Sequence, residues 1–375
     1  MTSRAPRAWF GAAVALAACA TAPTPGPAAV VATTFLPEIA ADGAREAHVL
    51  YQDGALPTPV PGGTLWTFGD TFLGTRNPDG SPAYAGDRSN TIALLPAGER
   101  SFPPKLRYLR SDDGVARAPL TLLDGEDAKT RRLWPLAGVQ LGERSYMFYG
   151  LIDITGPGPW GFKPLGTGLA RSDVAFGAYE RLAPTGGGWP IDPTSIVQRD
   201  GWLYLYAPRR FHGEQALHSG LLIARVRPDD LERPDTYGFF AGRDERGEPL
   251  WTVRVEDAVE ATDGVWGQAS VAWHPAARAF LLATSSNLFR ADGIQLRRSA
   301  TPWGPWEPLS SSDGWITVPE RPGEQTQLIY CTMLHPELDD PDGRTVTLTF
   351  CRMLKREWAF TNPELVRVEL VGDAR

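Results

Sequence analysis

The chain has few of the residue patterns that build metal and nucleotide sites. Its five histidines are scattered and show no ligand spacing such as His-Glu-x-x-His, so no zinc site is indicated. There is no Gly-rich phosphate-binding loop and no Gly-x-Ser-x-Gly nucleophile motif. No run of Lys or Arg occurs, and the formal net charge is −7. Because phosphate contacts need clustered cations, we expect no nucleic-acid partner.

Long apolar runs are also missing, except at the N-terminus. Arg4 and Arg7 precede an apolar run over residues 8–17, which is the pattern of a signal peptide. The run ends in Leu16-Ala17-Ala18-Cys19, which resembles the bacterial lipobox, whose Cys becomes the lipidated first residue of the mature protein. No other apolar run approaches the roughly 20 residues needed to span a bilayer.

We therefore expect a lipoprotein signal peptide over residues 1–18, lipidation at Cys19, and attachment to a membrane through the lipid alone. An ordinary secretory signal cleaved near Ala20 to Ala22 is the alternative. Residues 19–35 are rich in Ala, Pro and Thr and are expected to be a flexible tether. The predicted location is the bacterial cell envelope, in the periplasm or on the outer surface.

The chain has only three cysteines. With Cys19 lipidated, Cys331 and Cys351 are the thiols that remain. They flank the stretch 335–344 almost symmetrically, so in an antiparallel hairpin closed there they would face each other at a Cα separation of roughly 4.5–5.5 Å, within reach of a disulfide. Export permits such a bond. The alternative is two buried free cysteines, because a slip of one residue separates them.

A two-stranded pattern recurs about five times along the chain. The second strand of each copy is rich in aromatic or other apolar residues, and 39 glycines and 34 prolines suit many short strands and tight turns. The copies pair residues 47–49 with 62–70, 134–141 with 144–150, 195–198 with 201–207, 268–274 with 279–284, and 328–334 with 344–351. Such a repeat predicts an all-β fold, a five-bladed β-propeller forming one domain over residues 36–375.

Several segments resemble a known family. Asp42-Gly43-Ala44, followed by the sequence TLWTFGDT over residues 64–71, resembles the opening of domain-of-unknown-function family 4185. Later matches to that family cover residues 168–172, 224–226, 304–306 and 335–338, and the whole resemblance spans about residues 40–370. The family is similar to the five-bladed propellers of arabinanases and other glycosidases, and some members are similar to, or are, endo-D-arabinofuranases.

The resemblance implies a catalytic pair, Asp42 and Asp70. Glycoside cleavage needs one acid to protonate the leaving oxygen and one base or nucleophile at the anomeric carbon. We expect Asp42 at the entry of the innermost strand of blade 1 and Asp70 at the end of the next strand, although the stretch 55–61 lengthens this hairpin. Asp192, in Ile-Asp-Pro, is the expected auxiliary carboxylate. The alternatives are a turn cap at Asp70 and an Asp-Pro turn at Asp192.

Sugar binding needs aromatic platforms and polar donors. The candidates for substrate binding are Trp134, Trp189, Arg209, Trp266, Gln268 and His335. The alternatives are packing between blades for the tryptophans, a surface salt bridge for Arg209 and a satisfied polar residue for His335. Blade 4 begins with Trp266-Gly267-Gln268 and has no acid where related propellers commonly carry one. No cofactor and no metal are expected, although a cation in the channel would be consistent with related propellers.

Two functions follow from these observations. The first is a lipid-anchored glycoside hydrolase, expected to be a monomer, that cleaves a furanose-rich, arabinan-like polysaccharide. The second is a non-catalytic propeller lipoprotein that binds a glycan or a protein. The missing acid on blade 4 favours the second function, whereas the Asp-Gly and Gly-Asp-Thr elements favour the first.

Overall fold

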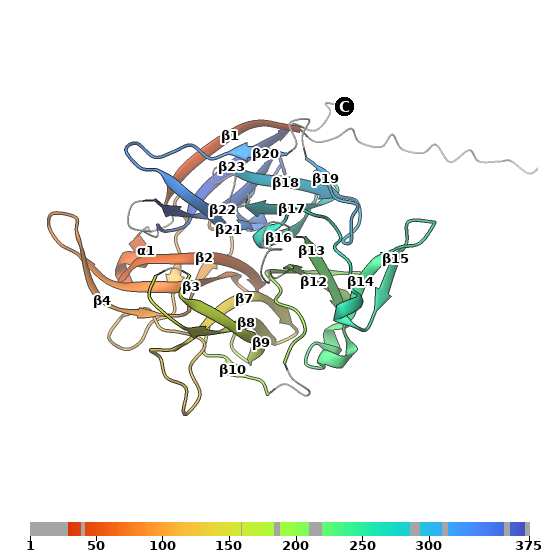
Figure 1. The fold of residues 1–375 in the computed structure, drawn as a ribbon. Coiled ribbons are helices and arrows are strands. Elements are labelled where there is room, and N and C mark those ends of the chain that lie inside the picture. The colour runs from red at the N-terminus through yellow and green to blue at the C-terminus, as the bar shows by residue number, and fades with distance from the viewer. Residues whose placement is uncertain are drawn as a thin grey trace, which may run out of the picture.

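The computed structural model describes residues 29–38, 42–158, 160–183, 188–209, 220–285, 293–309, 314–355 and 361–371. The predicted signal peptide, Cys19 and the first part of the predicted tether lie outside these residues. The described residues form five antiparallel sheets arranged as blades around a common centre (Figure 1), which confirms the predicted five-bladed β-propeller.

Each blade is a sheet of four or five strands. Blade 1 contains β2 (Val49–Val60), β3 (Gly63–Arg76), β4 (Pro82–Arg88), β5 (Thr91–Pro96) and β6 (Arg107–Tyr108). Blade 2 contains β7 (Arg131–Leu141), β8 (Arg144–Ile154), β9 (Phe162–Ser172) and β10 (Glu180–Arg181). Blade 3 contains β11 (Ser195–Arg199), β12 (Trp202–Pro208), β13 (Leu221–Val226), β14 (Gly238–Arg243) and β15 (Pro249–Thr252).

The last two blades follow the same order from the centre outwards. Blade 4 contains β16 (Trp266–His274), β17 (Ala279–Ser285), β18 (Gly293–Ser299), β19 (Glu307–Pro308) and β20 (Trp315–Thr317). Blade 5 contains β21 (Thr326–Leu334), β22 (Thr345–Leu354), β23 (Glu364–Val371) and β1 (Ala29–Glu38). The short helices are α1 (Asp42–Glu46), η2 (Pro228–Asp230), η3 (Pro234–Thr236), η4 (Val255–Asp257) and η5 (Pro336–Leu338).

The innermost strands β2, β7, β11, β16 and β21 surround the axis and contact one another. Hydroxyl groups tie neighbouring inner strands together. Thr194 Oγ1 donates to the carbonyl of Ala269 (2.7 Å) and accepts from its N–H (3.0 Å), and Ser195 Oγ bonds Val271 in the same way. These bonds fix the backbone of β11 relative to that of β16 beside the axis.

The ring closes through β1, which pairs antiparallel with β23 at the outer edge of blade 5. The sequence predicts a flexible tether up to residue 35, so the prediction is wrong for residues 29–35. Apolar side chains explain the difference. Phe35 meets Phe350 edge to face at 6.5 Å, and Val30 packs against the same core. The first and last described strands therefore share one sheet, which closes the ring of blades.

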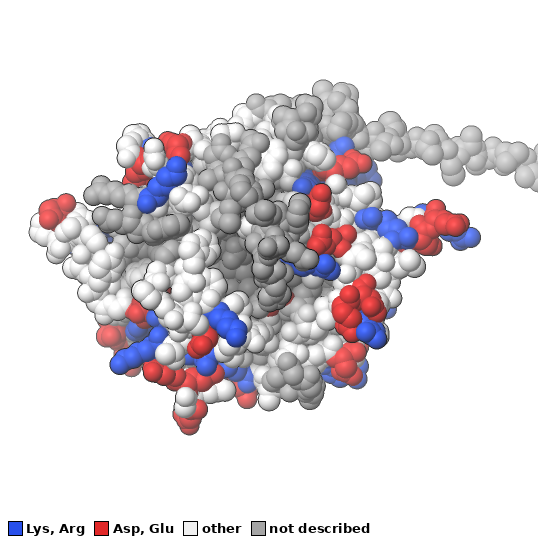
Figure 2. Space-filling model, viewed as in Figure 1, with Lys and Arg blue, Asp and Glu red and all other residues white. Residues whose placement is uncertain are grey.

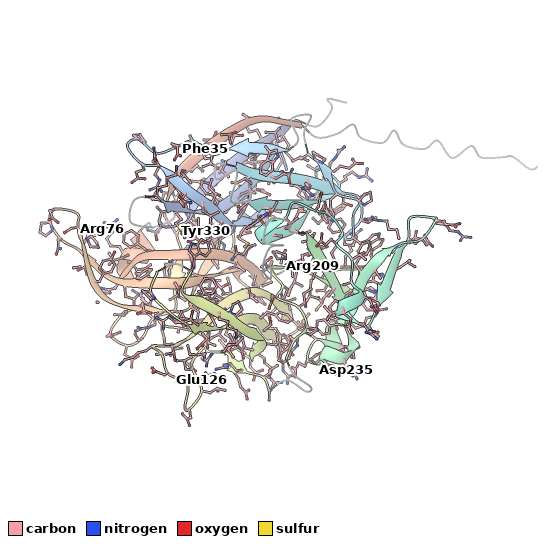
Figure 3. All side chains as sticks on the ribbon, viewed as in Figure 1. Phe35, Arg76, Glu126, Arg209, Asp235 and Tyr330 are labelled. Atoms are coloured by element: carbon pink, nitrogen blue, oxygen red, sulfur yellow. The ribbon has the colours of Figure 1, made fainter. Side chains whose placement is uncertain are left out.

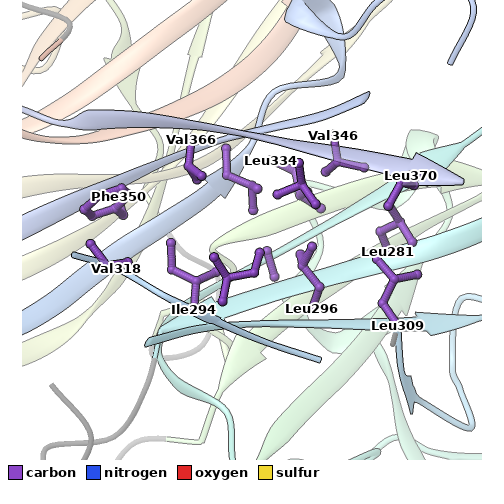
Figure 4. Close-up of a cluster of buried hydrophobic side chains, with 14 of the residues drawn as sticks. Leu281, Ile294, Leu296, Leu309, Val318, Leu334, Val346, Phe350, Val366 and Leu370 are labelled. Carbon is purple, nitrogen blue, oxygen red and sulfur yellow. The ribbon is translucent and has the colours of Figure 1, made fainter. Parts of the chain in front are cut away.

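The blades pack face to face through apolar side chains. Figure 4 shows this packing between blades 4 and 5, where Val346, Val366 and Leu370 face Ile294 and Leu296. Middle strands such as β22 are buried on both faces. Because full burial of a large aliphatic side chain contributes roughly 1.5–3 kcal/mol, these contacts are the main source of stability.

Blade 1 differs from its prediction at the start. Its inner strand begins at Val49, and Asp42 is the first residue of α1, ahead of that strand. Residues 55–60 belong to β2 and pair with β3, so they are not an insert in the hairpin. Pro57 and Pro59 are tolerated because β2 is an edge strand and needs no donors towards the axis.

On the face shown in Figure 2, the acidic and basic side chains of the described residues are interspersed around the periphery. Within the described ranges, no helix has the length and apolar character needed to cross a membrane.

Candidate active site

A cavity of about 390 Å³ opens where the inner strands meet. Its walls are mostly apolar and aromatic, with few polar side chains among them. The side chains that matter most for its chemistry are Asp53, Asp70, Trp134, Trp160, Phe162, Trp266, Gln268 and Tyr330. An apolar pocket with a few convergent polar groups is the usual form of a small-molecule site.

Asp53 reaches the cavity through an irregularity in β2. The pairing of β2 with β3 shifts on both sides of Gly54, and Gly54 and Ala55 have φ values of 96° and 95°. The N–H of Gly54 lies 3.3 Å from the sulfur of Cys351, which holds the bulge against blade 5. Positive φ is unfavourable for Ala, so the surrounding structure imposes this conformation, as is common at functional sites.

Asp70 lies on β3 beside Asp53. Its side chain is 36 % exposed and lines the cavity. Trp134 Nε1–H donates a hydrogen bond to Asp70 Oδ1 (3.1 Å), and Arg132 Nε lies 4.0 Å from the same oxygen. Blade 2 therefore fixes the orientation of a carboxylate that blade 1 supplies.

Gly69 lets the two carboxyl groups come together. A Cβ atom at position 69 would lie 2.2 Å from Asp53 Oδ1, so only Gly leaves room for that carboxyl. Asp53 also accepts a hydrogen bond from the backbone N–H of Asp70. The close approach is therefore built into the chain by a residue without a side chain.

We expect Gly69→Ala to force the Asp53 carboxyl to turn away and lose this hydrogen bond. The free energy of unfolding, measured by urea titration, should fall by about 1 kcal/mol. The control is Gly166→Ala on β9, where an added Cβ meets nothing within 4 Å. Equal stability of the two variants would contradict the close approach of Asp53 to Gly69.

Burial and mutual repulsion give the carboxyl groups of Asp53 and Asp70 different pKa values. Burial, with a further contribution from the charge of Asp70, raises the pKa of Asp53 to about 8. Burial also raises the pKa of Asp70 to about 6, although the Trp134 hydrogen bond and the Arg132 charge oppose the rise. At pH 7 the pair thus holds one proton, mainly on Asp53, and one negative charge, mainly on Asp70.

Asp53 is the residue that sequence reasoning missed. The resemblance assigned the Asp-Gly element to Asp42, which is the first residue of α1 and lies ahead of the inner strand β2. The side chain of Asp42 lies outside the described ones, so its predicted pairing with Asp70 stays a prediction, and the carboxyl group that the structure places beside Asp70 is that of Asp53. A second Asp-Gly dipeptide, Asp53-Gly54, lies closer to Asp70 along the chain and was the available signal.

Three predicted binding residues line the cavity with Asp70. These are Trp134, Trp266 and Gln268. Gln268 Oε1 accepts the N–H of Cys331 (3.2 Å), which connects blade 4 to blade 5. Their predicted contact with a substrate remains a prediction, but their positions agree with it.

Four other predicted site residues lie away from the cavity walls. Trp189 is buried in the core between blades 2 and 3, where its Nε1–H donates to the carbonyl of Leu231. His335 is fully buried between Glu337 and Thr349, each 2.9 Å from one ring nitrogen. Neither ring can touch a ligand in the cavity, so these two predictions are wrong.

Arg209 and Asp192 are partly exposed but do not line the cavity either. Arg209, labelled in Figure 3, donates to the carbonyl of Ala258 and pairs with Glu260 (3.4 Å). Asp192 lies in the loop before β11 and is half-buried. A substrate-binding role for Arg209 and an auxiliary role for Asp192 stay predictions.

Cys331 and Cys351 are free thiols in the structure, and both are buried. The predicted disulfide is absent because the hairpin register differs from the symmetric one. Cys351 is paired with Tyr330, and a bulge after Tyr330 displaces Cys331 from direct opposition. The alternative of two buried free cysteines agrees with the structure.

Over the described ranges, no group of three or more His, Cys, Asp or Glu side chains could hold a metal ion. The cation considered for the channel remains a prediction, and no chemistry of the site is derived from one.

Comparisons with known proteins give a family and a fold. The family model "Domain of unknown function (DUF4185)" matches residues 54–354. No curated protein matches the chain. A solved "putative hydrolase" from Bacteroides ovatus superposes with a TM-score of 0.62 at 20% identity and covers 87% of each chain. At this identity the likeness shows the fold alone.

Two glycoside hydrolases of known structure are less similar. A GH43_1 enzyme from Xanthomonas citri has a TM-score of 0.48 at 14% identity, over 89% of this chain and 91% of its own. A family 117 glycoside hydrolase from Zobellia galactanivorans has a TM-score of 0.48 at 13% identity, over 92% and 90%.

Proposed function

The chain belongs to the DUF4185 family, and from that premise we propose that it is a glycoside hydrolase that uses Asp53 and Asp70 as its catalytic pair. The observation that carries the proposal is the meeting of these two carboxyl groups in one aromatic-lined cavity, with their pKa values moved apart. Two titratable groups with separated pKa values are the usual arrangement for acid and base roles.

The roles follow from the protonation states. Asp53, which keeps its proton near neutral pH, protonates the leaving glycosidic oxygen. Asp70, which is ionised and held by Trp134, acts at the anomeric carbon as nucleophile or as the base for a water molecule. Fixing Asp70 with an indole N–H keeps its charged form aimed into the cavity.

The substrate we propose is a neutral, furanose-rich polysaccharide of the arabinan type. Trp134, Trp160 and Trp266 supply flat apolar faces against which sugar rings can stack. Among the described residues that line the cavity there is no Lys or Arg, which favours a neutral sugar over a uronate or a sulfated one. Action in the cell envelope, as a lipoprotein anchored through Cys19, is the accompanying proposal and rests on the sequence of the N-terminus.

The proposal is tested by incubating the protein with a panel of glycans and measuring reducing ends. The panel contains neutral arabinans and xylans together with polygalacturonate as an anionic comparison. We expect the wild type to release reducing ends from a neutral furanose polymer, and the double variant Asp53→Asn/Asp70→Asn to release none. The double variant should fold, because it removes the repulsion between two neighbouring carboxyl groups whose charged forms are disfavoured at this site.

Two results of this experiment would contradict the proposed function, and each has a different meaning. If the wild type binds a glycan of the panel, measured by calorimetry, but cleaves none, the protein is the non-catalytic binding propeller that the missing acid on blade 4 favours. Cleavage that persists in the double variant would instead move the chemistry to other residues.

A further inference from the structure

Strand β21 brings a tyrosine into the same cavity. Cys331 has a φ of 50°, and the pairing of β21 with β22 is interrupted between Tyr330 and Met333. The N–H of Cys331 is held by Gln268 Oε1 (3.2 Å). This local turn of the strand places Tyr330 on the cavity wall, and Figure 3 shows it near the middle of the ring.

The hydroxyl group of Tyr330 is enclosed, and within the described residues it has no hydrogen-bond partner. Other enclosed tyrosines of this fold do have partners. Tyr206 donates to the carbonyl of Pro302 (2.8 Å), and Tyr237 donates to the carbonyl of Leu231 (2.8 Å). Because buried polar groups are nearly always satisfied, an exception that lines a cavity points to a partner supplied by a ligand.

The neighbours of Tyr330 determine what that partner is. Burial, with smaller contributions from the neighbouring acids Asp53 and Asp70, raises the pKa of the Tyr330 phenol well above its ordinary value. The phenol is thus neutral at working pH, and its O–H is an unsatisfied, enclosed donor at the wall of the cavity that Asp53 and Asp70 also line.

Building on the proposed hydrolase function, we propose that Tyr330 is a third catalytic residue, which donates a hydrogen bond to a sugar hydroxyl or ring oxygen at the bond that Asp53 and Asp70 cleave. Hydrogen bonds to oxygens next to the anomeric carbon strengthen as the oxocarbenium-like transition state forms. A donor already fixed by the bulge in β21, and left without a protein partner, is preorganised for that task.

The test is Tyr330→Phe, which removes one oxygen atom and leaves the ring. We expect kcat on the polymer to fall about 10- to 100-fold with little change in KM, because the hydrogen bond counts mainly in the transition state. The melting temperature should stay the same or rise, since an unsatisfied buried hydroxyl is removed.

Tyr206→Phe is the matched control, because its hydroxyl is satisfied and lies in the core away from the cavity. It should lower the melting temperature and leave kcat unchanged, so the two variants should respond in opposite ways.

An unchanged kcat in Tyr330→Phe, with an active wild type, would overturn the role of Tyr330 and leave the proposed hydrolase standing. A drop in melting temperature like that of Tyr206→Phe would also overturn it, because it would reveal a protein partner for the hydroxyl. A wild type that cleaves nothing would remove the proposed function itself and this inference with it.

Discussion

Asp53→Asn is expected to lower kcat/KM for glycan cleavage by about 10²- to 10⁴-fold at pH 7, the usual contribution of a general acid. Asn keeps the size and can still accept the N–H of Asp70, but it has no proton to give to the leaving oxygen. The same change is expected to raise the stability of the fold at neutral pH. Loss of activity together with a gain in stability is characteristic of a strained functional group.

The gain in stability depends on pH in a defined direction. The pKa of Asp53 rises from 3.8 to about 8 on folding, so between these values the folded state holds a proton that the unfolded state has lost. The stability of the wild type therefore falls as pH rises through this window. The melting temperatures of wild type and Asp53→Asn should nearly coincide near pH 4 and differ by several degrees at pH 8.

The pH dependence of activity should reflect the ionisation of the same two groups, Asp53 and Asp70. The wild-type kcat/KM is expected to rise with pH as Asp70 ionises near pH 6 and to fall as Asp53 loses its proton near pH 8, with apparent values that belong to the pair. The control is Asp79→Asn, an exposed turn carboxylate whose pKa is lowered by the Ser81 hydrogen bonds. It should keep full activity and show no gain in stability. An Asp53→Asn variant with a wild-type pH profile would contradict the assignment.

Much of the fold could be predicted because propeller blades repeat. Strands such as β8 and β12 are buried on both faces by neighbouring blades, and this burial selects the continuous aromatic runs that mark each copy in the sequence. The predictions failed where the structure departs from the repeat. The first described strand, β1, closes blade 5 through pairing with the last, β23, a contact between segments far apart in the sequence that no local pattern indicates.

The part of the site that lies on regular strands could also be predicted, whereas the part that depends on irregular backbone could not. Asp70 and Trp134 lie within β3 and β7, strands that the repeated pattern and the family resemblance already indicated. Asp53 depends on a double irregularity at Gly54 and Ala55, and an Ala with positive φ leaves no trace in the sequence. The side-chain directions of Trp189, in the loop before β11, and of His335, directly after β21, are fixed by packing, which one sequence does not reveal.

Arg352→Ala is expected to lower the free energy of unfolding by about 3 kcal/mol, because it leaves a buried carboxylate without its main partner. The Arg352 side chain is 2% exposed, and its guanidinium makes a two-pronged contact with Glu364, at 2.7 and 3.1 Å. It also donates to Thr326 Oγ1 (2.5 Å). Glu364 and Thr326 begin β23 and β21, so one side chain joins three strands of the blade that closes the ring.

The size of the fall in the free energy of unfolding distinguishes the loss of an ion pair from the loss of packing. Arg321 lies 3.0 Å from Glu364 and still pairs with it after the substitution, so the loss should fall at the lower end of the roughly 3–5 kcal/mol found for broken buried pairs. Replacing both partners, Arg352→Met with Glu364→Leu, removes the orphaned charge and should recover most of the stability.

Urea titration at pH 7 measures all variants, with Arg344→Ala as the exposed control, since that side chain is 79% exposed and should change stability by less than about 0.5 kcal/mol. A double variant as unstable as Arg352→Ala would mean that the three strands need the directional hydrogen bonds of this guanidinium and not merely a filled, neutral interior.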